Sequence, residues 1–200
     1  MGQSRADADS ALNSSAEDPA MTRISGTAAS VTSVALALAA IAVSHAMSAQ
    51  DRSTLRVPNG LAFSEFKGYE DWPTISVSQT GNLIEVIVGN PVMMAASRAG
   101  LPAKGKQFPN DAKMAKIHWN ATKSAEAPGP TTIPGELHDI DFMLKDSKRF
   151  ADSGGWGYAQ FNYDAATKTF TPLGTDAKCG FACHTIVADK DYVFTSYGNR

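Results

Sequence analysis

Met114-Ala-Lys-Ile-His-Trp119 alternates in character from one residue to the next. Successive side chains of a β-strand point to opposite faces of its sheet, so this alternation predicts a strand with two unlike faces. The apolar face carries Ala115, Ile117 and Trp119, and the other carries Met114, Lys116 and His118. A lysine in the middle of a strand is unusual, which marks this second face as a candidate for function.

The neighbouring stretches predict further strands and a few short helices. In residues 137–144 the same alternation separates His138, Ile140, Phe142 and Leu144 from Asp139, Asp141 and Met143. The other expected strands are 75–78 and 83–88, which the turn Thr80-Gly-Asn82 joins as a hairpin, then 156–163 and 192–195. Helical segments are expected at 61–67, at 91–99 after the cap Asn90, and at 146–150. We expect one α+β domain, predominantly antiparallel β-sheet, with residues 127–135 as a proline-rich loop.

Composition excludes some functions. The chain has 200 residues, of which 43% are hydrophobic and 19% are charged, as in a globular protein. Residues 50–200 carry 16 basic and 16 acidic side chains. Nucleic acid is not expected as a partner, because its binding depends on clustered lysine and arginine that neutralise phosphates.

Residues 1–49 resemble an N-terminal extension with a secretory signal. Arg23 precedes the apolar run Val34-Ala-Leu-Ala-Leu-Ala-Ala-Ile-Ala-Val43, and small residues follow it, in the order of a cleavable leader. Its ten residues are few for a membrane helix, which needs about 20. We therefore expect a protein that is periplasmic or otherwise exported, with no membrane span in its mature form. An uncleaved anchor is the alternative.

The cysteine motif is the most informative for function. Lys178-Cys-Gly-Phe-Ala-Cys-His-Thr185 is one residue longer than the C-x-x-C-H signature by which two thiols bind haem covalently and the histidine ligates iron. We expect Gly180 to let the extra residue bulge. A local disulfide between Cys179 and Cys183 is the alternative. Zinc would lack a complete set of four ligands.

Several motifs resemble the cytochrome P-460 family in order and spacing over about residues 61–200. They are Lys145-Asp-Ser-Lys-Arg-Phe-Ala151, Gly154-Gly-Trp-Gly157, the cysteine segment and Asp191-Tyr-Val-Phe-Thr195. The resemblance implies a mostly β-sheet haem domain at 50–200, one covalent c-type haem, a homodimer and an open iron position. Enzymes of the family oxidise hydroxylamine and carry a lysine–porphyrin cross-link. The similar cytochromes c′-beta lack that bond and bind gases such as nitric oxide.

The resemblance also assigns residues. Phe108-Pro-Asn-Asp-Ala-Lys-Met-Ala-Lys116 matches the family segment that ends at the cross-linking lysine, so Lys116 is the candidate. Lys113 is out of phase and should face away. The alternative for Lys116 is a solvated lysine on an edge strand. Some family enzymes have an arginine where this chain has Glu85.

The remaining expected roles complete a mechanism. Cys179 and Cys183 hold the haem, and His184 ligates its iron. Asp141 is the candidate general base for substrate protons, and a solvated carboxylate is its alternative. His118 and His138 are expected to be packed or solvated. The leading hypothesis is a hydroxylamine-oxidising haem enzyme that passes electrons to an external acceptor. The alternatives are a gas-binding cytochrome c′-beta-like protein and, more weakly, a haem-free domain with a disulfide.

Overall fold

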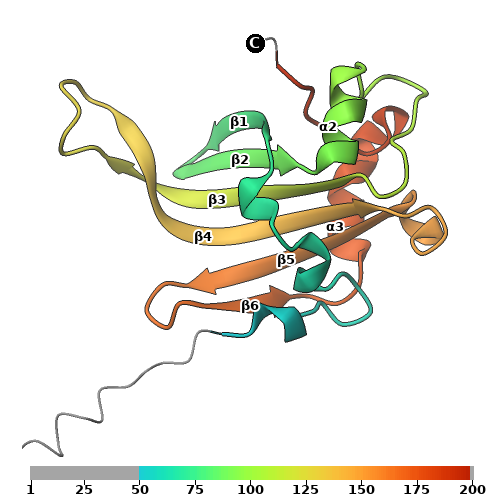
Figure 1. The fold of residues 1–200 in the computed structure, drawn as a ribbon, viewed down its shortest axis with the longest axis horizontal. Helices are drawn as coiled ribbons and strands as arrows, with labels where there is room; N and C mark the ends of the chain where they lie inside the picture. Colours follow the sequence, from blue (N-terminus) through green and yellow to red (C-terminus); the bar gives the residue numbers. More distant parts are fainter. Residues whose placement is uncertain (1–49, 199–200) are drawn as a thin grey trace, which may run out of the picture. The chain divides into compact units, whose positions relative to one another are not determined.

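The computed structural model describes residues 50–198, so the expected leader at 1–49 lies outside the described residues. Six antiparallel strands form one sheet whose spatial order is their order in the chain (Figure 1). Their bounds are β1 Thr74–Thr80, β2 Leu83–Gly89, β3 Lys113–Lys123, β4 Thr132–Lys145, β5 Trp156–Asp164 and β6 Thr169–Leu173. This confirms the α+β class with a predominantly antiparallel sheet.

Short helices accompany the sheet. The α-helices are α2 (Pro91–Arg98) and α3 (Lys178–His184), and 3-10 helices span Arg52–Thr54, Phe63–Phe66, Tyr69–Asp71, Ala151–Ser153 and Thr185–Lys190. The expected start of α2 is confirmed, since the Asn90 side chain accepts a hydrogen bond from the Met93 N–H and Pro91 is the first helical residue.

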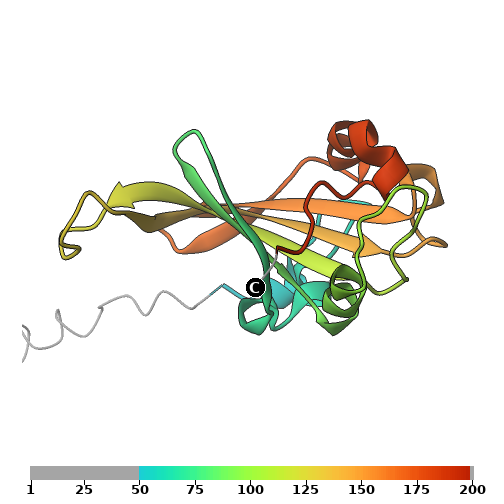
Figure 2. The same cartoon turned by 90° about the horizontal axis from the view of Figure 1, so that it is seen from above.

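The two faces of the sheet are covered differently. The N-terminal segment of the described chain, residues 50–73, lies on one side and α3 lies on the other (Figure 2). On the N-terminal side, Phe63 and Phe66 pack against Phe142 and Phe161 of β4 and β5. Ring centroids of Phe66 and Phe142 are 4.1 Å apart and nearly parallel. The apolar faces predicted for residues 114–119 and 137–144 thus contribute to the main core. The opposite, polar faces of the same strands lie on the side of α3.

Three expectations about strands and loops need correction. Residues 192–195 form no strand, because Asp191 and Tyr192 have positive φ angles of 55° and 62° that extended pairing does not allow. A strand that we did not expect, β6, pairs with β5 and buries Phe170. The expected loop at 127–135 is shorter, since β4 already begins at Thr132. Its Pro134 lies where β4 pairs only with β3, so no hydrogen bond of a central strand is lost.

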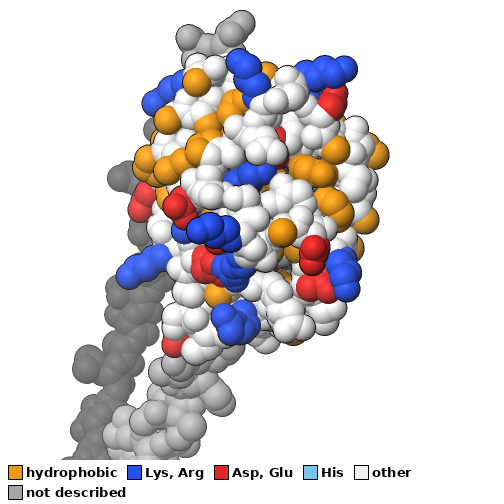
Figure 3. All heavy atoms as spheres, turned by 90° about the vertical axis from the view of Figure 1, so that its right-hand side faces the viewer, with side chains coloured by type: hydrophobic (Ala, Val, Ile, Leu, Met, Phe, Trp, Pro, Cys, Tyr) orange, Lys and Arg blue, Asp and Glu red, His pale blue; other side chains and the backbone are white. Residues whose placement is uncertain are grey.

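The surface agrees with the balanced charge of the sequence. On the face shown in Figure 3, lysine and arginine side chains are interspersed with acidic and apolar ones. Within residues 50–198, no helix combines the length and apolar character needed to cross a bilayer.

Candidate functional site

The two cysteines lie one turn apart on α3. Residues at i and i+4 share one face of a helix, so Cys179 and Cys183 present their side chains on the same side. Both are exposed free thiols, and not the disulfide of the alternative hypothesis. The expected bulge at Gly180 is wrong, because the helix is continuous there. The glycine serves close packing instead, since a Cβ at this position would lie 2.6 Å from Tyr158 Cβ.

His184 is the last residue of α3, and its imidazole is oriented by a backbone carbonyl. Its Nδ1 lies 2.6 Å from the Tyr192 carbonyl oxygen, to which it can only donate. Donation from Nδ1 leaves the lone pair of a neutral ring on Nε2, the tautomer that a metal ligand needs. Burial lowers the pKa of His184, which also favours the neutral ring. The rings of Tyr158 and Phe194 flank it at 5.0 and 4.8 Å between centroids.

These residues fit a haem of the c type. Two free thiols on one helical face stand next to an imidazole whose Nε2 is available for iron. Phe194, which contacts that imidazole, is 47% exposed, so apolar surface is available beside the ligand. The buried Tyr158 hydroxyl has no hydrogen-bond partner within the described chain. The donor set therefore matches the one that the cysteine motif predicts.

A buried ion pair holds the segment that orients His184. Lys145 Nζ at the end of β4 lies 2.6 Å from Asp191 Oδ1, and both side chains are at most 3% exposed. The other carboxylate oxygen, Asp191 Oδ2, accepts a hydrogen bond from the Phe108 N–H at 2.7 Å. Asp191 directly precedes Tyr192, whose carbonyl accepts from His184. The ion pair therefore ties β4 to the backbone that fixes the imidazole.

We expect Lys145→Met to lower the free energy of unfolding by about 3–5 kcal/mol, because it leaves the Asp191 carboxylate buried without a counter-charge. Denaturant unfolding of the purified protein measures this change. Lys178→Met is the matched control, since the Lys178–Asp176 pair has an 89% exposed lysine and should contribute at most about 1 kcal/mol. Equal effects of the two variants would contradict a structural role for the buried pair.

Lys116 lies on the same side of the sheet as His184. Its positive charge is near enough to lower the pKa of His184, after the larger effect of burial. Its Nζ lies 2.9 Å from Glu85 Oε2, and Glu85 is only 6% exposed. Burial acts to raise the pKa of Glu85, but hydrogen bonds from Lys116 and Ser78 outweigh it and leave the pKa lowered. Lys113 faces away as expected, with Nζ donating to the Glu65 carbonyl at 2.8 Å.

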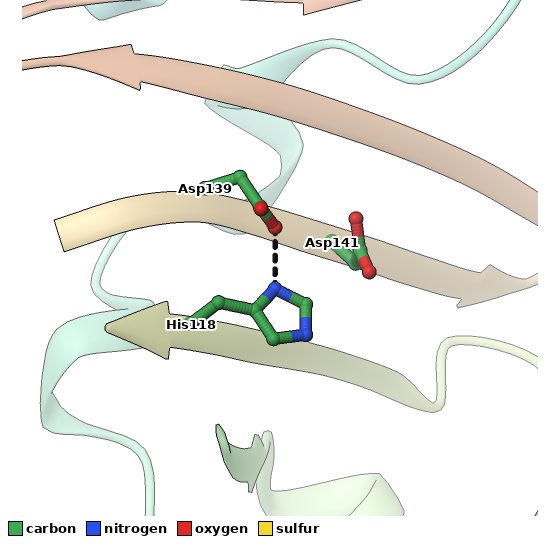
Figure 4. Close-up of side chains that lie close together, drawn as sticks. All are labelled: His118, Asp139 and Asp141. Carbon is green, nitrogen blue, oxygen red and sulfur yellow. Dashed lines mark hydrogen bonds and ion pairs between the residues drawn. The ribbon is translucent and has the colours of Figure 1, made fainter. Parts of the chain in front are cut away.

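Asp141 lies opposite Lys116 in the pairing of β3 with β4, beside His118 and Asp139 (Figure 4). One polar atom from each of Asp141, His118 and Asp139 lies within 4.8 Å of the other two. Burial, reinforced by the nearby Asp139 and Glu85 carboxylates, raises the pKa of Asp141 to about 6, although His118 and Lys116 oppose the shift. A carboxyl group with this pKa can exchange protons near neutral pH.

Asp139 joins two histidines. Its two oxygens contact Nδ1 of His118 and Nδ1 of His138 respectively. Burial opposes ionisation, but these hydrogen bonds leave the pKa of Asp139 lowered. His118 is buried and His138 is half-exposed. Since both Asp139 oxygens contact imidazole nitrogens, we interpret the group as a hydrogen-bonded network rather than as metal ligands.

His138 is not on the apolar face that its position in the sequence suggests. His118 pairs with Asp139 and Trp119 pairs with Leu137, so the register shifts and His138 is an extra residue in a β-bulge. The bulge allows its ring to reach the Asp139 carboxylate. Alternation alone does not reveal such an insertion.

A cavity of the described chain lies away from these residues. It measures about 370 Å³ and lies on the apolar side, between Trp72 of the N-terminal segment and Trp119 of β3. None of the candidate residues lines it. The polar side that carries Lys116, Asp141 and α3 therefore remains the candidate site on chemical grounds.

Some residues of the site were not expected from the sequence. Glu85 stands where some enzymes of the family have an arginine, but the sequence does not predict its ion pair with Lys116. Asp139 is predicted on the polar face of its strand, with no role assigned. Lys145 and Asp191 appeared only within motifs. Lys145 and Asp191 are 46 positions apart in the chain, so a local sequence pattern does not show that they form an ion pair.

Comparison with known protein families gives a match. A family model described as Cytochrome P460 matches residues 66–195, which include the polar strands, the cysteine motif and the Asp191 segment. No curated protein sequence matches the chain. The matched region covers more than half of the 200 residues and contains the thiols and the oriented histidine that fit a haem. The chain therefore belongs to the cytochrome P460 family, whose members are haem cytochromes.

Proposed function

We propose that this protein is an exported c-type cytochrome that oxidises hydroxylamine. Cys179 and Cys183 would form the two thioether bonds, and His184 Nε2 would ligate the iron. Lys116 Nζ would be bonded to the porphyrin rim. The haem, when bound, supplies an iron centre that accepts electrons from the substrate and has an open coordination position.

The arrangement of His184 carries this proposal. The Tyr192 carbonyl selects the tautomer that ligates through Nε2, and the charge of Lys116 acts on the same imidazole. The candidate axial ligand and the candidate cross-linking lysine are thus on one side of the sheet. Asp141 is adjacent to Lys116 in register and has a pKa of about 6, which suits a general base for hydroxylamine protons.

A gas-binding role is the second candidate, and the Lys116–Glu85 ion pair favours it. Lys116 Nζ is held by the Glu85 carboxylate at 2.9 Å, and bond formation at a porphyrin rim would have to break this ion pair. Without the cross-link, the same haem site would suit a cytochrome c′-beta-like protein that binds nitric oxide.

Export, an external electron acceptor and homodimer formation belong to the same proposal. The leader-like pattern at 1–49 supports export, and the family resemblance supports the other two. Mass analysis of the mature N-terminus tests whether the leader is removed.

One preparation tests the proposal. The protein is produced in a host that matures c-type haems, and its intact mass is measured after extraction with acid and acetone. We expect a haem-sized increment, a tryptic map without cleavage after Lys116, and turnover of hydroxylamine with an artificial electron acceptor. Retained haem with an ordinary Lys116 peptide and no turnover would instead support gas binding. A colourless protein would exclude both functions.

A further inference from the structure

A series of ionisable side chains leads from Asp141 on the polar face, through two buried groups, to the exposed His138. The His118 side chain is 7% exposed and the Asp139 side chain 4%, whereas His138 is 50% exposed. Asp141 is partly exposed on the polar face where the proposed haem would bind, and its polar atom lies within 4.8 Å of polar atoms of His118 and Asp139 (Figure 4).

The contacts between these groups form a continuous path. Asp139 uses one oxygen for His118 Nδ1 and the other for His138 Nδ1, so its carboxylate bridges the two rings. Only the step from Asp141 to His118 and Asp139 exceeds direct hydrogen-bond distance, and it is short enough for one bridging water. The β-bulge at His138 is what brings the exposed ring into the path.

We propose that His118, Asp139 and His138 conduct protons between Asp141 and solvent. The inference rests on the proposed function, in which Asp141 receives protons from hydroxylamine. His118, Asp139 and His138 are positioning residues that act through Asp141.

Each transfer moves a proton and no electrons. Asp141 releases its proton through the bridging water to His118, and His118 transfers its Nδ1 proton to Asp139. The Asp139 carboxyl then donates a proton from Oδ2 to Nδ1 of His138 in its Nε2–H tautomer, and the exposed ring releases its Nε2 proton to bulk water. One proton is thereby moved from Asp141 to solvent, and the return of His118 and His138 to their starting tautomers completes the cycle. Imidazole supports this transfer because its two nitrogens can accept and donate near neutral pH.

The groups around the series are an ion pair on one side and neutral side chains on the other. Glu85 on β2 is buried, pairs with Lys116, and lies 3.8 Å from His118 Nε2. On the other side, β5 places neutral side chains, Gln160 and Asn162, opposite Asp141 and Asp139. Among these groups, only His138 is both in the series and substantially exposed.

His138→Gln tests the relay in the matured holoprotein, because glutamine keeps a hydrogen-bond donor for Asp139 but does not titrate. In dilute buffer we expect kcat to fall about tenfold, less than the roughly hundredfold or greater effect of losing the base itself. A small, hindered buffer that does not ligate iron should restore the rate in proportion to its concentration. Glu136→Gln, at an exposed position on the same strand, should change neither rate nor buffer dependence.

An infrared pH-jump measurement tests the relay without substrate. The carboxylic C=O band of Asp141, assigned by subtraction of the Asp141→Asn spectrum, should appear more slowly in His138→Gln than in the wild type. If the band appears more slowly in His138→Gln and the wild-type protein does not turn over hydroxylamine, the relay is supported and the proposed function is rejected. Unchanged infrared kinetics in His138→Gln would overturn the relay whatever the turnover.

Discussion

Lys116→Leu is expected to leave haem attached and to abolish both the red-shifted absorption of the cross-linked porphyrin and the oxidation of hydroxylamine. The thioether bonds and the axial ligand come from α3, which this substitution does not touch. The leucine removes the only nitrogen that we propose to bond to the ring. Intact mass, the absorption spectrum and hydroxylamine turnover measure the three effects.

Two further variants separate chemistry from structure. Leucine leaves the Glu85 carboxylate buried without its partner at 2.9 Å, which should lower stability by about 1–3 kcal/mol. Lys116→Arg keeps a positive charge for Glu85 and should restore stability but not the absorption band or turnover. Lys113→Leu, on the opposite face, should retain both. Normal turnover in Lys116→Arg would contradict the cross-link.

Asp141→Asn is expected to lower kcat about 10²–10⁴-fold, the usual contribution of a positioned general base. In the wild type, the active carboxylate form increases as pH rises through the pKa of about 6. We therefore expect the rate to rise with pH through this value and to become independent of pH above it. A pH–rate profile tests the assignment, and the variant should lose this ionisation. Asp152→Asn, at an exposed position, is the control and should keep the wild-type profile.

Stability provides an independent check on Asp141. Its pKa is raised in the folded protein, so the folded state binds this proton more tightly than the unfolded chain, whose carboxyl titrates near about pH 4. The contribution of Asp141 to stability therefore falls as pH rises from about 4 to about 6. Asparagine removes this dependence and should not reduce stability at neutral pH. A variant that is both inactive and strongly destabilised would indicate a structural role.

Sequence alone determined the class of fold and, except at the His138 bulge, the faces of the two central strands. Alternation placed Lys116 and His118 together and separated Lys113 from them, because side-chain direction in a strand depends only on the residue's own position. The helix N-cap at Asn90 could likewise be predicted from the sequence, since the residues involved are neighbours in the chain. The motifs also identified the family that the comparison shows.

Tertiary structure alone decided which of these residues meet. The pairing of β3 with β4 placed Asp141 opposite Lys116, and a bulge turned His138 toward Asp139. The positive φ angles at Asp191 and Tyr192 replaced an expected strand with the turn that orients His184. Register, bulges and buried ion pairs depend on packing between distant segments, which local residue patterns do not by themselves specify.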